Sequence, residues 1–124
     1  MRHAELCPFC NAEGVVFTNS LAHARLDRFP VARGHLLIVP NRHVSDWFDT
    51  TTEERQAIFA LADEARARLV GESAPDGFNL GINVGEAAGQ TVWHAHLHLI
   101  PRYRNDVPNP RGGVRAVIPG KQSY

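Results

Sequence analysis

The stretch His94-Ala95-His96-Leu97-His98-Leu99-Ile100 alternates imidazole and apolar side chains, and Pro101 follows it directly. Successive side chains of a β-strand point to opposite faces of the sheet, so the three histidines are expected to share one face. The apolar residues between them then face a hydrophobic core. Three histidines in register lose apolar burial and strand propensity at each position, which makes a merely solvated face a poor explanation. The pattern therefore indicates a chemical site on a strand.

Two kinds of chemistry use such a row of imidazoles. Histidines at alternate strand positions bind a catalytic metal, or one neutral imidazole attacks phosphorus while the others orient it and bind phosphate. The preceding loop, residues 85–91, contains two glycines, and backbone N–H groups of such loops can approach an anion closely. Gln90 and Thr91 add uncharged donors beside the histidines. These neighbours favour a phosphate site.

A second group of candidate ligands is the pair Cys7 and Cys10, separated by Pro8 and Phe9. We expect no secretion signal before this pair, so a structural disulfide is not expected in a reducing compartment. Spacing alone leaves three interpretations: a redox dithiol, half of a zinc site that needs two further ligands, or two unrelated thiols. The seven histidines of the chain could supply the missing ligands of a zinc site.

The composition indicates one globular domain and argues against several classes of protein. The chain has 124 residues, of which 44% are hydrophobic and 21% charged, as in an ordinary single domain. Thirteen Lys and Arg balance thirteen Asp and Glu, so the formal net charge is zero, unlike that of a protein that binds nucleic acid by neutralising phosphates. No apolar run in the sequence approaches the roughly 20 residues of a membrane span. We therefore expect a cytoplasmic protein with neither a nucleic-acid nor a membrane partner.

The hydrophobic pattern predicts one main helix in the middle of the chain. Thr51 and Glu54 match a capping box, in which each residue satisfies a backbone N–H of the other. The apolar residues that follow recur at helical spacing: Ile58, Leu61, Ala62, Ala65 and Leu69. Gly71 is expected to end the helix.

Alternating and apolar runs predict strands on both sides of this helix, at residues 15–18, 22–29, 35–39, 78–84 and 91–100. Together these elements predict an α+β fold, with an antiparallel sheet of about five strands and one main helix in a single domain, residues 1–124. The core is expected to span residues 1–103. Residues 104–124 are rich in proline and glycine and are expected to form an extended tail that lies over another part of the protein.

The sequence resembles the histidine triad (HIT) family, whose motif is His-φ-His-φ-His-φ-φ with φ apolar. Residues 94–100 match this motif in full, with Gly89-Gln90-Thr91-Val92 before it and Pro101-Arg102 after it, as is usual in the family. The segment from Gly34 to Pro40 is similar to the Gly-His strand of the family. The resemblance covers roughly Cys7 to Arg102 and implies a HIT-like fold.

The resemblance also implies a mechanism. His96, the middle histidine, would attack the α-phosphorus of a nucleotide derivative and form a nucleotidyl-histidine, which water or another acceptor then resolves. The backbone carbonyl of His94 would hold the Nδ1 proton of His96 and leave Nε2 free to attack. His98 would contact the bridging or α-phosphate oxygen. His94, His96 and His98 are therefore the predicted catalytic residues.

Further residues are expected to bind the substrate by the same resemblance. Gln90 and Thr91 would contact phosphate oxygens, Asp27 the ribose hydroxyls, and Asn83 the sugar or a phosphate. Leu26 and Leu37 are candidates for the base pocket. His35 would support the triad without touching the substrate. His3 and His23 are left without a role and are expected at the surface.

The resemblance extends to a metal site. Some bacterial members, and the related uridylyltransferases, bind zinc through a Cys-x-x-Cys pair, a histidine after the Gly-His strand and the first histidine of the triad. The matching residues here are Cys7, Cys10, His43 and His94. A Cys₂His₂ set is a closed structural site. Mg²⁺ is a second candidate cofactor, as an aid to binding a polyphosphate.

Several activities remain open at this stage. Within the family they are hydrolysis of dinucleoside polyphosphates, with diadenosine polyphosphates favoured, hydrolysis of adenosine phosphoramidates, and nucleotidyl transfer or phosphorolysis. From other classes, the alternatives are a metalloenzyme in which the three histidines hold a catalytic zinc and a nucleotide-binding protein without turnover. Family members are commonly homodimers, and contact is expected at the helix around residues 53–70 and the strand around residues 78–84.

Overall fold

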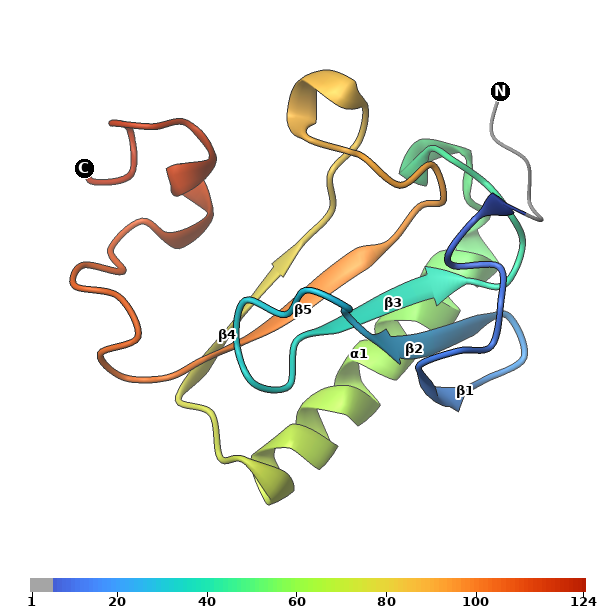
Figure 1. Ribbon diagram of the computed structural model, residues 1–124, viewed down its shortest axis with the longest axis horizontal. Helices are drawn as coiled ribbons and strands as arrows, with labels where there is room; N and C mark the ends of the chain where they lie inside the picture. The colour runs from blue at the N-terminus through green and yellow to red at the C-terminus, as the bar shows by residue number, and fades with distance from the viewer. Residues whose placement is uncertain (1–5) are drawn as a thin grey trace.

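Five short strands form one antiparallel sheet in the computed structural model, which describes residues 6–124 (Figure 1). The strands are β1 (Val15–Thr18), β2 (Ala22–Leu26), β3 (Leu36–Pro40), β4 (Gly77–Gly81) and β5 (Leu97–Arg102). Their order across the sheet is β1-β2-β3-β5-β4. One long helix, α1 (Thr52–Glu72), connects β3 to β4. The α+β fold with five strands and one main helix, expected from the sequence, is therefore confirmed.

The two faces of the sheet have different partners, and alternate residues of β3 show this directly. Leu36 and Ile38 face α1, where they pack in the apolar core between helix and sheet. Leu37 and Val39 point to the opposite face and pack with Cys7 and Phe9 from the N-terminal segment. The helix thus covers one face (Figure 1), while the other face is left for the site.

The N-terminus of α1 has the expected capping box. The Thr51 hydroxyl accepts from the Glu54 backbone N–H at 3.0 Å, and the Glu54 carboxylate accepts from the Thr51 N–H at 2.8 Å. The same carboxylate takes two hydrogen bonds from the Arg42 guanidinium, at 2.9 and 3.0 Å. Glu54 is only 4% exposed, so this buried charge ties the turn after β3 to the start of the helix.

The helix was expected to end at Gly71, but it continues through Gly71 and ends at Glu72. The N–H groups of Ser73 and Ala74 both donate to the Leu69 carbonyl. Ala74 adopts a positive φ of 48°, the conformation that a glycine after a helix usually supplies. Gly71 therefore lies inside the last turn and does not stop it.

The strand predicted at residues 91–100 is wrong in its first six residues, because β5 begins only at Leu97. The segment just before β5 is not paired with β3. It lies beside the turn that follows β3, where the Ala95 N–H donates to the Val44 carbonyl at 2.7 Å. At its other end β5 continues through Pro101. Pairing with β3 stops at Leu99, so a proline two residues later lies where β5 has only β4 as a neighbour.

The remaining boundaries shift by a few residues. β2 ends at Leu26 where residues 22–29 were expected, β3 is moved by one residue, and β4 covers Gly77–Gly81 where residues 78–84 were expected. Residues 104–124 form a lobe beside β4 (Figure 1). This tail folds back on itself through a short 3₁₀ helix (Gly113–Val117) and a 2.6 Å hydrogen bond from the Gln122 side chain to the Asn109 carbonyl.

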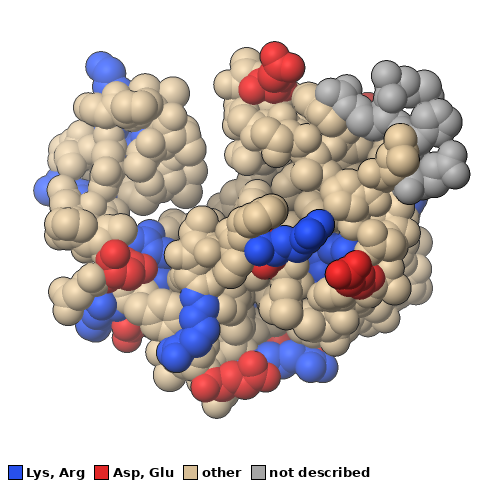
Figure 2. Space-filling model, in the orientation of Figure 1, with Lys and Arg blue, Asp and Glu red and all other residues tan. Residues whose placement is uncertain are grey.

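Charged side chains of both signs are scattered over the face drawn in Figure 2, and the described residues visible on that face form no single basic area. In the part of the chain that the structure describes, no helix combines the length and apolar character needed to cross a bilayer.

The helix cap gives a first testable prediction. Thr51→Ala removes the hydroxyl that accepts the Glu54 N–H, and it should lower the free energy of unfolding by about 1 kcal/mol in urea titrations. Thr52→Ala, one residue later at an exposed position, is the matched control and should be nearly neutral. An equal loss in both variants would show that the cap does not stabilise the helix.

Candidate functional site

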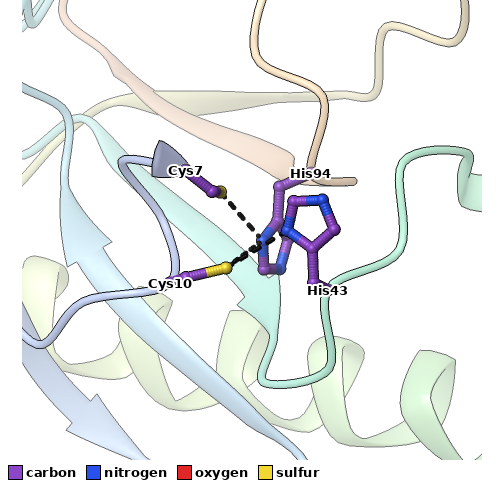
Figure 3. A group of neighbouring side chains, drawn as sticks. All are labelled: Cys7, Cys10, His43 and His94. Carbon is purple, nitrogen blue, oxygen red and sulfur yellow. Dashed lines mark hydrogen bonds between the residues drawn. The ribbon is translucent and has the colours of Figure 1, made fainter. Parts of the chain in front are cut away.

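Four potential metal ligands lie close together, one of them the first histidine of the row (Figure 3). Cys7 and Cys10 come from the N-terminal segment, His43 from the turn after β3, and His94 from the segment before β5. Their ligand atoms all lie within 4.8 Å of one another. These four residues, the Cys–His cluster, are the set expected from the resemblance, although the sequence separates the first from the last by 87 positions.

The ring of His94 is fully buried, and its two nitrogens have different partners. Nε2 lies 2.7 Å from the Pro40 carbonyl oxygen, which can only accept, so Nε2 carries the proton. Nδ1 is then the free lone pair, and it lies 3.3 Å from Cys7 Sγ and 3.5 Å from Cys10 Sγ. A histidine that donates one N–H to a carbonyl and offers the other nitrogen to a metal is the usual arrangement of a ligand.

The Cys–His cluster fits zinc better than a redox dithiol. Two sulfurs and two imidazole nitrogens are the donors that a closed tetrahedral zinc site uses, and such a site would tie the N-terminal segment to the strand with the triad. Desolvation raises the pKa of the Cys10 thiol to about 11, and the hydrogen bond and charge of Cys7 add to the rise. Reactive redox cysteines have lowered pKa values instead. A bound cation would favour the thiolates.

His96 is held in the tautomer that leaves its outer nitrogen free. Its Nδ1 lies 2.8 Å from the His94 backbone carbonyl, so Nδ1 carries the proton and Nε2 has the lone pair. Burial lowers the pKa of His96, which keeps the ring neutral near neutral pH. The hydrogen bond expected from the resemblance is therefore present.

His98 is held in the opposite tautomer by a chain that starts at the backbone. The Val31 N–H donates to His35 Nδ1 at 3.1 Å, so the proton of the neutral His35 ring is on Nε2. His35 Nε2 lies 3.0 Å from His98 Nδ1, which must then accept. Burial lowers the pKa of both rings, so both are neutral near neutral pH. The remaining proton of His98 is therefore on Nε2.

The same chain argues against a second metal site. Asp27, His35 and His98 bring their ligand atoms within 4.8 Å of one another. A metal on His35 Nε2 would need a lone pair there, whereas the Val31 N–H holds the lone pair on Nδ1. Asp27 Oδ2 lies 3.3 Å from the protonated Nε2 of His35 and 4.0 Å from His98 Nδ1, so its carboxylate faces an N–H there and not a metal-binding lone pair. No other such cluster occurs among residues 6–124, so Mg²⁺ gains no support.

A cavity of about 610 Å³ opens beside His96 and His98, within the size range of small-molecule sites. We name it the triad cavity. Residues expected to bind substrate that line it are Leu26, Asp27, Leu37, Asn83, Thr91 and His98. Phe9 also lines it, with its ring centroid 5.0 Å from that of His96. An apolar wall and a few polar groups therefore face the free nitrogen of His96.

Residues 10–105 match the family model described as the HIT domain. The chain belongs to the HIT family. The match includes the whole histidine row as well as Cys10 and His43. The resemblance seen in the sequence is thereby confirmed, and this family includes nucleotide hydrolases and phosphorylases.

Three relatives bear on the site. A Zn-bound histidine triad family protein from Mycobacterium smegmatis has a TM-score of 0.77 at 31% identity, covering 86% of this chain and 82% of that chain. An AP-4-A phosphorylase from Mycobacterium tuberculosis is 36% identical over 104 residues, or 82% of this chain and 53% of the relative. A bis(5'-adenosyl)-triphosphatase from Dictyostelium discoideum is 36% identical over 95 residues, or 77% of this chain and 64% of the relative.

Gln90 does not line the triad cavity, unlike Thr91 and His98, two other side chains expected to contact phosphate oxygens. Its side chain is 4% exposed and donates to the carbonyls of Ser45 and Val92, at 2.7 and 3.1 Å. Its carbonyl oxygen accepts from the Gly85 N–H at 2.9 Å. In this structure Gln90 braces its loop against the turn after β3, and a phosphate contact by Gln90 stays a prediction.

In the loop before the HIT motif, several backbone N–H groups are used in hydrogen bonds within the loop itself. The N–H groups of Ala88, Gly89 and Gln90 donate to carbonyls at residues 85 and 86. These N–H groups therefore close the loop and are not directed at an anion, contrary to the expectation for its glycines. Among the loop donors expected to bind phosphate, Thr91 is the one that lines the triad cavity.

Two histidines left without a role in the sequence have different outcomes. His3 lies outside the described residues. His23 was expected at the surface, but it is only 7% exposed, and its Nδ1 lies 3.0 Å from the Asn41 side-chain oxygen.

Phe9 received no role from the sequence, although it lies between two candidate ligands. If Cys7, Cys10 and His94 share one metal site, the residue between the two cysteines must lie close to the triad, and this signal in the sequence could have identified Phe9.

Zinc content gives the prediction for this site. Cys7→Ala removes one of two anionic ligands, so the purified protein should lose zinc and unfold at lower temperature. His96→Ala is the control and should keep its zinc, because His96 Nδ1 is bonded to a carbonyl and not to the cluster. Metal analysis of both proteins gives the answer. Full zinc content in a Cys7→Ala/Cys10→Ala double variant would contradict the assignment.

Proposed function

We propose that this HIT protein is a nucleotide hydrolase that acts at the α-phosphate of adenosine derivatives, with diadenosine polyphosphates as the favoured substrates. The observation that carries the proposal is the pairing of opposite tautomers on neighbouring rings. His96 offers a lone pair at Nε2, and His98 offers an N–H at Nε2, with ring centroids 5.0 Å apart. A nucleophile and a donor for the leaving group are the two elements that a displacement at phosphorus needs.

In the first step the lone pair of His96 Nε2 forms a bond to the α-phosphorus, and the bond from phosphorus to the leaving oxygen breaks. The leaving phosphate takes that electron pair, and the His98 N–H stabilises the negative charge by a hydrogen bond. The His96 ring becomes positively charged, which strengthens its Nδ1–H bond to the His94 carbonyl. Fixing this bond in advance removes a reorganisation cost from the transition state.

In the second step water attacks the phosphorus of the nucleotidyl-histidine. The bond from phosphorus to nitrogen breaks, its electron pair returns to His96 Nε2, and a water proton is released. The products are a nucleoside monophosphate and the free enzyme, and the two steps together consume one water. A zinc held by Cys7, Cys10, His43 and His94 would be a structural tie for the segment that carries the triad, and the two steps use only His96, His98 and water.

The choice of adenosine derivatives rests on the relatives and on the triad cavity. The names of two relatives refer to AP-4-A and to a bis(5'-adenosyl) substrate. The cavity offers an apolar wall from Phe9 and Leu37 and the carboxylate of Asp27, which suit a base and ribose hydroxyls. Hydrolysis of an adenosine phosphoramidate, and nucleotidyl transfer or phosphorolysis, use the same first step and remain the alternatives.

Two alternative functions, a zinc-dependent enzyme and a nucleotide-binding protein without turnover, have less support. A catalytic zinc on His94, His96 and His98 would need three converging lone pairs, whereas His94 Nδ1 lies beside Cys7 and Cys10. A nucleotide-binding protein without turnover would have the same cavity. The free Nε2 of His96 favours the enzyme over the binder, because binding alone does not require a bare nucleophile beside an N–H donor.

A comparison of wild type with His96→Ala tests the proposal. Wild type should release AMP from diadenosine tetraphosphate, and from an adenosine phosphoramidate more slowly, while His96→Ala should lose at least about 1000-fold in kcat with zinc retained. Binding of AMP by both proteins, measured by calorimetry, is the control for a folded site. Saturable binding without turnover in wild type would favour the binder, and equal turnover in the variant would exclude His96 as the nucleophile.

We also propose that the protein is a homodimer. β4 is an edge strand, with β5 on one side only, and exposed edges of this kind are usually covered. Leu80 on β4 and Phe59 on α1 are 46% and 49% exposed, so each of these two elements presents an apolar side chain that a second copy could cover. Sedimentation equilibrium at micromolar concentration should give twice the chain mass of 13.7 kDa, and a monomer there would contradict the proposal.

A further inference from the structure

Arg25 is the next-to-last residue of β2 and lies on the same face of the sheet as the triad. It is paired with Leu37 of β3, which is paired in turn with His98 of β5. Only 5% of Arg25 is exposed, an uncommon state for an arginine. The N-terminal segment with Cys7 and Cys10 covers it. A buried guanidinium requires hydrogen-bond partners, and the identity of those partners indicates what it does.

The guanidinium donates to four backbone carbonyls of the segment that carries the cysteines. The distances are 3.0 Å to Pro8, 3.3 Å to Phe9, 3.1 Å to Asn11 and 2.6 Å to Glu13. A fifth contact, 3.3 Å, reaches the side-chain oxygen of Asn11. These contacts come from the two terminal nitrogens, which carry four N–H groups in one plane, so some contacts share an N–H. A lysine offers three donors on a single atom and cannot span the same carbonyls. Arg25 thus fixes the path of the chain through and beyond the cysteine pair.

A second arm of the network reaches the other half of the Cys–His cluster. Arg25 donates to His23 Nε2 at 3.1 Å, so the proton of the His23 ring is on Nδ1. That N–H donates to the side-chain oxygen of Asn41 at 3.0 Å. Asn41 lies two residues before the ligand His43. One chain of hydrogen bonds therefore runs from the cysteine segment through Arg25 and His23 to Asn41, beside the turn that carries His43.

The same segment brings an aromatic ring to the triad cavity. The Phe9 ring lies 5.2 Å from the centre of the Arg25 guanidinium and 5.0 Å from the His96 ring. Its backbone carbonyl is one of those that Arg25 binds. The path that sets the distance between the two sulfurs thus also sets the position of an apolar wall beside the nucleophile.

We propose that Arg25 is a positioning residue that couples the metal site to the substrate cavity: it holds the Cys7–Cys10 segment for metal binding and, through Phe9, the cavity wall beside His96. It also lines the triad cavity, but its N–H groups are directed at the backbone of that segment and at His23, so it acts through them. The part of this inference that concerns the cavity rests on the proposed function, and the part that concerns the metal does not.

Two substitutions at Arg25 test the inference, with an exposed arginine as the control. Arg25→Met removes all the hydrogen bonds and keeps an apolar stem, and Arg25→Lys keeps the charge but not the fork. Arg66→Met, on the exposed side of α1, is the matched control. Phe9→Ala separates the two effects, because it trims the cavity wall and leaves the backbone that Arg25 binds.

The first readout is zinc affinity, measured by competition with a chromophoric chelator in the full chain. Both Arg25 variants should bind zinc about 10- to 100-fold more weakly, the usual effect of removing a residue that orients metal ligands. Phe9→Ala and Arg66→Met should match wild type. If Arg25→Met does not fold, Arg25→Lys alone gives the zinc affinity that tests the inference. Wild-type zinc affinity in a folded Arg25 variant, whatever its melting temperature, would overturn the inference.

The second readout is the split between KM and kcat, measured with saturating zinc on whichever nucleotide wild type turns over. Arg25→Lys and Phe9→Ala should both raise KM severalfold and change kcat less, because each loosens the wall that binds the substrate. An unchanged KM in Arg25→Lys beside a raised KM in Phe9→Ala would remove the link to the cavity. Absence of turnover in wild type would count against the proposed function alone, since the zinc readout needs no substrate.

Discussion

The arrangement of the site depends on His94, because each of its polar groups makes a different connection. Its Nε2–H donates to the Pro40 carbonyl, its Nδ1 faces the two sulfurs, and its backbone carbonyl accepts the Nδ1–H of His96. The ring is fully buried, so none of these contacts competes with solvent. A metal on Nδ1 would therefore fix the carbonyl that sets the tautomer of the nucleophile.

The structure also explains why the carbonyl of Pro40 is available. β3 pairs with β5 only between residues 36–38 and 97–99, so the end of β3 extends beyond its neighbour. The segment before β5 leaves the sheet at that point, and His94 occupies the space beside Pro40. Buried rings nearby have lowered pKa values because of desolvation, yet no described buried side-chain N or O atom lacks a partner. Neutral rings with fixed partners are the state in which one lone pair and one N–H can be directed at a substrate.

Much of this was predictable from the sequence where one short pattern decided the outcome. The capping box at Thr51 and Glu54 and the alternation from Leu97 onward depend on near neighbours, and both are present as expected. The start of β5, the bracing role of Gln90 and the buried network of His23 and Arg25 depend on chain segments far apart in the sequence. Local spacing assigns His23 to the surface because the partner that satisfies it, Asn41, is visible only in the fold.

The most direct test of this account is the protonation pattern of the two reactive rings. Two-bond ¹H–¹⁵N correlation spectra of zinc-loaded protein with ¹⁵N-labelled histidine distinguish the tautomers of neutral imidazoles, and His96→Gln and His98→Gln variants assign the signals. The account predicts a proton on Nδ1 of His96 and a proton on Nε2 of His98 at pH 7.5. A proton on Nε2 of His96 would leave no lone pair for attack on phosphorus and would contradict the central claim.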